Sequence, residues 1–205
     1  MDKMLVCIGR QPNSFGIGIE NIGVRTDKKG WIVADDHMKT NVDNVYAIGD
    51  ILGPSRIMLA HAASTEGIAA AENAMGSNRK MDYHAVPAAI FTSPEVACVG
   101  LSEQQAIEGG YEIRAESVLF RTTAKAQVMG EISGQAKIIS DANSGKVLGV
   151  HIIGPHATDL IAESTLAVRL AATVRDIGET IYAHPTLSEI MLELAHKAEG
   201  HPIHG

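Results

Sequence analysis

Residues 1–80 alternate short apolar runs with turn residues. Three such runs, at 4–8, 30–36 and 45–48, predict short strands. We expect the strands at 4–8 and 45–48 to be buried. The Ala-rich stretch 57–76 predicts a helix that ends at Gly76, the usual position of a helix-terminating glycine. Short buried strands and a helix are typical of doubly wound domains, so we expect a partial α/β nucleotide-binding segment here.

From residue 85 onward the pattern changes. Alternating or short apolar runs predict strands on both sides of Ser93-Pro94, at 111–120, and in a hairpin over 134–154 that turns at DANSG. Helical patterns follow Ser102 and occupy 158–173, 174–181 and 187–198. This order predicts an α+β layer, an antiparallel sheet with helices on one face.

Composition narrows the class of protein. The 205 residues are 45% hydrophobic and carry a net charge of -7 without a basic cluster, which argues against a nucleic-acid surface. Cys7 and Cys98 lie far apart in apolar runs, so we expect both side chains to be buried in the protein. We also expect the protein to reside in a reducing compartment. The N-terminus shows no signal or transit pattern, and no run approaches the roughly 18–20 apolar residues of a membrane span.

The stretch HPTLSE at 184–189 has two interpretations. Thr186 and Glu189 have the spacing of a capping box, in which Thr186 caps the amide of residue 189 and Glu189 reaches back to the amide of residue 186. Alternatively, Glu189 orients His184, the side-chain type that titrates near neutral pH, for proton transfer. The local pattern leaves both open.

Three other positions could bind ligands. Asp50 ends the stretch TNVDNVYAIGD, either at the cofactor edge of a parallel sheet or in an ordinary Gly-Asp turn. His61 follows a helix start whose amides could face a polar group, and we expect it to be packed or in a polar network. A metal site at His201 and His204 would need two more ligands, and none is evident in the sequence. We therefore expect a polar tail.

Taken together, these motifs resemble the flavin-dependent pyridine nucleotide–disulfide oxidoreductases. LVCIGRQPN resembles the last strand of their NAD-binding domain, and TNVDNVYAIGD and MLAHAASTEG resemble flavin-binding segments. TSPEVACVGLSE, the hairpin with its following helix, and HPTLSE resemble their dimerisation domain. Within the family the chain is most similar to the dihydrolipoamide dehydrogenase branch. The resemblance implies an end of the NAD-binding domain at 1–35, part of the FAD-binding domain at 36–80 and a dimerisation domain at 85–205.

The resemblance also implies roles for individual residues. His184 would be the catalytic base and Glu189 its partner, with a cis His184–Pro185 bond. Asp50 would bind the ribityl chain of FAD, and Gly9 would contact NAD. The segment that would approach the flavin ring consists of Met58, Leu59, Ala60 and His61.

The family's redox disulfide and dinucleotide fingerprints are missing, because the sequence has neither C-x-x-x-x-C nor G-x-G-x-x-G. We therefore expect a fragment that is inactive alone, from a homodimer that uses FAD and NAD and meets 2-oxo acid dehydrogenase complexes through lipoyl groups. The implied compartment is the cytoplasm, or the mitochondrial matrix in a eukaryote. A glutathione- or mercuric-type reductase and a stand-alone dimerisation module remain alternatives.

Overall fold

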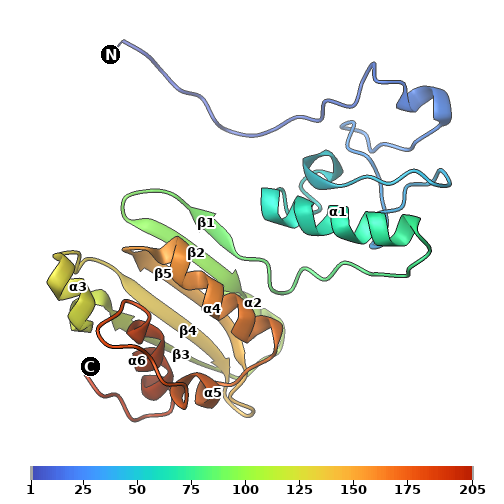
Figure 1. Ribbon diagram of the computed structural model, residues 1–205. Coiled ribbons are helices and arrows are strands. Elements are labelled where there is room, and N and C mark those ends of the chain that lie inside the picture. Colours follow the sequence, from blue (N-terminus) through green and yellow to red (C-terminus); the bar gives the residue numbers. More distant parts are fainter. Residues whose placement is uncertain (1, 205) are drawn as a thin grey trace. The chain divides into compact units, whose positions relative to one another are not determined.

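The computed structural model describes residues 2–204 (Figure 1). The chain divides into two compact units, residues 1–83 and 84–205. A finer boundary near residue 35 stays a prediction.

The first unit is built from turns, short helices and isolated bridges. Its elements are η1 (Ile19–Ile22), η2 (Gly49–Leu52) and α1 (Ala60–Ala74). The three strands predicted at 4–8, 30–36 and 45–48 are wrong. Within the described part of this unit, strand pairing is limited to the bridges Thr26–Ile32 and Lys39–Tyr46, so an apolar run finds no ladder to complete.

The segment 4–8 shows the consequence most clearly. Met4, Leu5 and Ile8 are exposed, and so is Cys7, which was predicted to be buried. Cys98 in the second unit is partly buried, and this burial raises the pKa of its thiol.

Helix α1 organises the rest of the first unit. It starts later than its pattern predicted, at Ala60, and it ends as predicted, with Gly76 in the left-handed conformation just beyond it. Ala69 is fully buried, and the core around it consists of Met38, Ala47, Leu52, Ala70 and Met81. Small side chains on α1 therefore let the preceding loops pack closely on it.

The second unit is a five-stranded antiparallel sheet with helices, as predicted. Its strands in spatial order are β1 (Ala88–Ile90), β2 (Glu95–Gly100), β5 (Val147–Gly154), β4 (Gln135–Asp141) and β3 (Ile113–Leu119). Successive side chains along each strand point to opposite faces of the sheet. Ala136 and Ile138 of β4 are fully buried, whereas Lys137 between them lies on the opposite face and pairs with Glu103.

The described residues of this unit also form five α-helices and the short 3-10 helix η3 (Phe120–Thr122). The α-helices are α2 (Glu103–Glu108), α3 (Ala124–Met129), α4 (Ala157–Arg169), α5 (Val174–Gly178) and α6 (Glu189–Ala198). Both α4 and α6 pack on the sheet (Figure 1). Ser102 caps α2 as predicted, and Gln105 reciprocates in a capping box. Helix α3 was not predicted, and the helix expected at 158–173 ends at Arg169 because Ala171 turns into the left-handed conformation.

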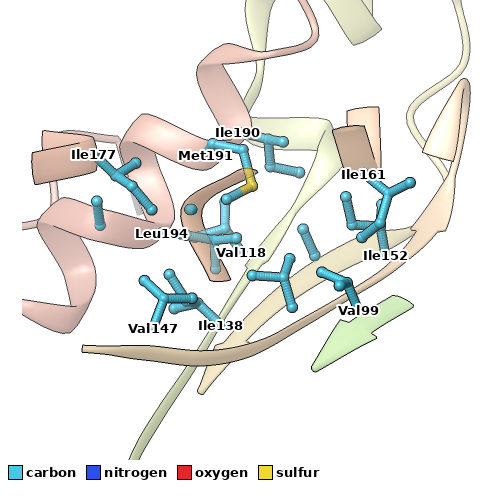
Figure 2. Close-up of a cluster of buried hydrophobic side chains, with 14 of the residues drawn as sticks. Val99, Val118, Ile138, Val147, Ile152, Ile161, Ile177, Ile190, Met191 and Leu194 are labelled. Atoms are coloured by element: carbon cyan, nitrogen blue, oxygen red, sulfur yellow. The ribbon is translucent and has the colours of Figure 1, made fainter. Parts of the chain in front are cut away.

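The core of the second unit lies between α6, α4 and the sheet (Figure 2). Ile190, Met191 and Leu194 of α6 are fully buried. They form one cluster with strand residues Val118 and Ile138. This packing fixes which face of α6 lies against the sheet, and therefore the orientation of the first turn of the helix, which begins at Glu189.

Candidate functional site

The predicted pair lies at the start of α6: Glu189 is the first residue of the helix, and His184 lies in the bend that precedes it. Nδ1 of His184 lies 2.8 Å from Oε1 of Glu189. A carboxylate can only accept, so Nδ1 carries the proton and a neutral ring keeps Nε2 as a proton acceptor. The His184 side chain is 70% exposed and that of Glu189 only 21%, so the imidazole faces outward over an anchored carboxylate. The His184–Pro185 bond is cis, as predicted.

The capping prediction is half right. The amide of Thr186 donates to Oε2 of Glu189 at 2.7 Å, as expected. The Thr186 hydroxyl does not cap the helix; it donates to the carbonyl of Ala183 at 2.8 Å, and Ser188 is the N-cap residue, without a side-chain bond. Each oxygen of Glu189 thus has its own donor, so the contacts to His184 and to the Thr186 amide coexist, and a role of the pair in proton transfer stays a prediction.

The contacts of Glu189 keep it ionised. Partial burial pushes the pKa of its carboxyl upward. The Thr186 amide, the His184 ring and the charges of His184 and His204 outweigh this and lower the pKa below its ordinary value of 4.5. The result is a stable anion next to an exposed imidazole, an arrangement compatible with general-base catalysis.

A second imidazole–carboxylate pair lies one helical turn further along α6. Glu193 is almost fully buried, and Nδ1 of His204 lies 2.5 Å from its Oε1. The amide of His204 also donates to Oε2 of Glu193, at 3.1 Å. The predicted polar tail is thus docked by its end, because a buried carboxylate requires donors.

An apolar groove of about 470 Å³ runs beside the pair, between α4 and the segment 180–188. Leu166, Leu170 and Ile181 line it. At its edge Tyr182 donates to Glu163, and burial raises the pKa of both side chains. The hydrogen bond to Glu163 raises the pKa of Tyr182 further, so the phenol stays neutral.

In the first unit, the structure brings two predicted cofactor segments together. Nη1 of Arg10 donates to Oδ2 of Asp50 at 2.6 Å and to the carbonyl of Met58 at 2.9 Å. Arg10 and Asp50 both keep about half of their side-chain surface exposed, at 53% and 52%. An exposed carboxylate therefore lies within reach of the start of α1 and suits a polar ligand.

The remaining predicted residues lie around that helix start. Leu59 is the N-cap of α1, and Ala60 and His61 are its first residues, with no side-chain cap. His61 is exposed, so it is not packed in the core. Gly9 lies next to Arg10 in an exposed segment, with nothing within 4 Å of the position that a Cβ would take.

Three residues of these sites were not predicted: Arg10, Glu66 and Glu193. Glu66 is fully buried in α1 and accepts from the amide of Gly49 at 2.6 Å. An acidic residue inside an apolar helical stripe is the pattern that could have indicated Glu66 and Glu193. Among residues 2–204, no cluster of three or more potential metal ligands occurs, and no helix is long and apolar enough to cross a membrane.

Two family models match the chain. The pyridine nucleotide-disulphide oxidoreductase dimerisation domain matches residues 86–195, and the pyridine nucleotide-disulphide oxidoreductase model matches residues 1–67. The first match spans the sheet and most of α6, and it includes the His184–Glu189 pair.

Relatives and solved structures agree with these matches. The chain is 47% identical over 99% of its length to dihydrolipoyl dehydrogenase of Chlamydia pneumoniae, and 45% identical over 99% to that of Bacillus subtilis. It covers only 44% and 42% of those proteins. LpdA of Mycobacterium tuberculosis superposes with a TM-score of 0.86 at 30% identity, covering 93% of this chain and 41% of LpdA. The chain belongs to the pyridine nucleotide-disulphide oxidoreductase family and contains its dimerisation domain.

Proposed function

We propose that this chain is part of a flavin-dependent dihydrolipoyl dehydrogenase and supplies its base and its dimerisation domain. The observation that carries the proposal is the 2.8 Å contact between His184 and Glu189 on the dimerisation domain. The 47% and 45% identity to dihydrolipoyl dehydrogenases supports the choice of dithiol substrate over that of the sister reductases.

The pair suits thiol chemistry. Nε2 of His184 accepts the proton of a substrate thiol, and Glu189 stabilises the resulting imidazolium. The thiolate then attacks a disulfide sulfur, forming a new S–S bond while the other sulfur leaves as thiolate. That disulfide must come from outside this sequence, because Cys7 and Cys98 lack the spacing of a redox pair. We therefore expect the chain alone to be inactive.

The first unit suits the flavin. Asp50 offers an exposed carboxylate to a ribityl hydroxyl, and Met58 to His61 offer backbone at an uncapped helix start. FAD, when bound, would carry two electrons from the dithiol to NAD. Gly9 would contact NAD.

The presence of a dimerisation domain supports a homodimer. In this proposal the exposed imidazole of His184 faces outward because it serves the partner subunit's disulfide. Lipoyl groups of 2-oxo acid dehydrogenase complexes would be its macromolecular substrates.

The test joins this chain to the portion of the Bacillus subtilis relative that it does not cover. We expect flavin absorbance and dihydrolipoamide-dependent NADH formation from this protein. His184→Gln should reduce the rate by roughly 10²–10⁴-fold, while the control His201→Gln, at an exposed tail position, should leave it unchanged. Turnover with glutathione but not with dihydrolipoamide would instead identify a sister reductase.

A further inference from the structure

We propose that Glu66 is a positioning residue, which fixes the Asp50 loop to α1 and so sets the geometry of the flavin site. Glu66 is fully buried in the middle of α1. Oε2 of its carboxylate accepts from the amide of Gly49, the residue directly before Asp50, at 2.6 Å. The proposal rests on the proposed function only in that Asp50 binds FAD.

The other oxygen of Glu66 is also occupied. The hydroxyl of Tyr83 donates to Oε1 at 2.7 Å. Burial and the bond to Glu66 raise the pKa of Tyr83, so its phenol remains a donor. The two donors come from the loop before Asp50 and from the last residue of the first unit. A buried carboxylate with two such donors is satisfied, whereas either donor alone would leave part of its charge unpaired.

Tyr83 extends the contact to a surface cluster. The guanidinium of Arg56 lies 5.4 Å from the centroid of the Tyr83 ring. Arg56 also pairs with Asp36 at 2.8 Å, and Lys80 pairs with the same carboxylate at 3.0 Å. The orientation of Tyr83 is therefore set from both sides, which holds its hydroxyl on Glu66.

Close packing adds a second restraint on the loop. Gly49 has a φ of +74°, and a Cβ there would approach the Ala63 side chain to 3.2 Å. A Cβ at Gly67 would lie 3.3 Å from Ile48. Residues 48 and 49 thus lie directly on the face of α1 that carries Ala63, Glu66 and Gly67, and the Glu66 bond fixes their position along that face.

This arrangement couples both predicted flavin segments to one side chain. Asp50 follows the amide that Glu66 holds, and Met58 to His61 lie at the start of the same helix. Because Glu66 holds the loop to the helix that begins at the second segment, a shift of its carboxylate would move Asp50 relative to Met58. Glu66 itself is buried and does not contact the ligand.

The first experiment uses the chain as it is. Amide hydrogen exchange at Gly49 and Asp50 is measured in wild type, Glu66→Gln and Glu66→Leu. Glu66→Leu should speed the exchange of Gly49 by roughly ten- to a hundredfold, since it removes a hydrogen bond to a charged group. Glu66→Gln keeps an acceptor for Gly49 and should stay within about threefold of wild type. Unchanged protection of Gly49 in Glu66→Leu would overturn the proposal.

Two controls separate positioning from general stability. Ala71→Gly destabilises the same helix at an exposed position, and Glu72→Gln removes an exposed carboxylate from its surface. Neither should change the exchange of Gly49 relative to the rest of the unit.

The second experiment measures FAD affinity by flavin fluorescence in the joined protein described above. Glu66→Leu should raise Kd at least about tenfold, and Glu66→Gln should restore most of the affinity. An unchanged Kd in Glu66→Leu would overturn the flavin-positioning role. If wild type bound no FAD, the proposed function would fail and the flavin role with it, whereas the exchange of Gly49 would still report the contact.

Discussion

Glu189 holds His184 with one carboxylate oxygen, at 2.8 Å, and the amide of Thr186 with the other, at 2.7 Å. The second bond fixes the carboxylate to the backbone of the bend, and the first then orients the imidazole. The helix-start contact and the proposed catalytic contact therefore share one carboxylate. The two oxygens of a carboxylate make this possible, and a side chain with a single acceptor could not replace it.

Glu189→Gln tests this double role. The carboxamide of the new Gln has one oxygen and can accept from only one of the two donors. We therefore expect it to keep the hydrogen bond from the Thr186 amide and to lose the one from Nδ1 of His184. The free energy of unfolding of the variant should be about 1–2 kcal/mol lower than that of wild type. In the joined protein, its kcat should fall with little change in KM. Chemical denaturation and steady-state kinetics measure the two effects, and an unchanged kcat would count against the orienting role.

The lowered pKa of Glu189 predicts a pH dependence of stability. A carboxyl whose folded pKa lies below its unfolded value contributes stability above that value, 4.5, and the contribution disappears as the pH falls through the folded pKa. The difference in unfolding free energy between wild type and Glu189→Gln should thus be largest near neutrality and shrink in acid. A difference that grew in acid would contradict the assignment.

The second unit was predictable because its pattern is strong. Alternation along β4 and β5 separates buried Ile138 and Val150 from the opposite face, and the turn DANSG fixes their pairing. The first unit was not predictable in the same way. An apolar run such as 4–8 becomes a strand only when another strand pairs with it, and within residues 2–83 the described structure offers only bridges.

The site divides along the same line. His184 and Glu189 are five residues apart, so the local pattern together with the family resemblance indicated the pair. Arg10 and Asp50 are separated by 40 residues, and Glu66 and Gly49 by 17. Such pairs are created by tertiary packing, and no periodicity along the chain records them.

Leu194→Ala tests the packing that orients α6. Leu194 is fully buried between the helix and the sheet, so truncation should cost about 2–5 kcal/mol of unfolding free energy. Leu170→Ala is the matched control, because Leu170 is 70% exposed and truncation of its side chain should cost less than about 0.5 kcal/mol. Equal losses in denaturation experiments would show that the described core does not carry the stability of this unit.

Gly154→Ala probes the end of β5. A Cβ at Gly154 would lie 2.5 Å from Cε2 of Phe120, which is fully buried and cannot move aside. Gly110→Ala separates the causes, because Gly110 also has a positive φ but nothing within 4 Å of its Cβ position. We expect Gly154→Ala to cost about 1–3 kcal/mol more than the control. Similar losses in the two variants would mean that backbone strain, rather than the clash, dominates.

The C-terminal tail is held on α6 by the contact between His204 and Glu193. Among the described residues, removing the ring in His204→Ala leaves the buried carboxylate of Glu193 with the backbone amide of residue 204 as its one donor, so the free energy of unfolding should fall by about 1–3 kcal/mol. Glu193→Gln should suffer less from the same truncation, since its side chain carries no charge to leave unpaired. A double-mutant cycle measured by denaturation gives this coupling directly. Faster amide exchange along residues 199–204 in His204→Ala would confirm that the tail is released, whereas additive losses would show that the two side chains do not interact.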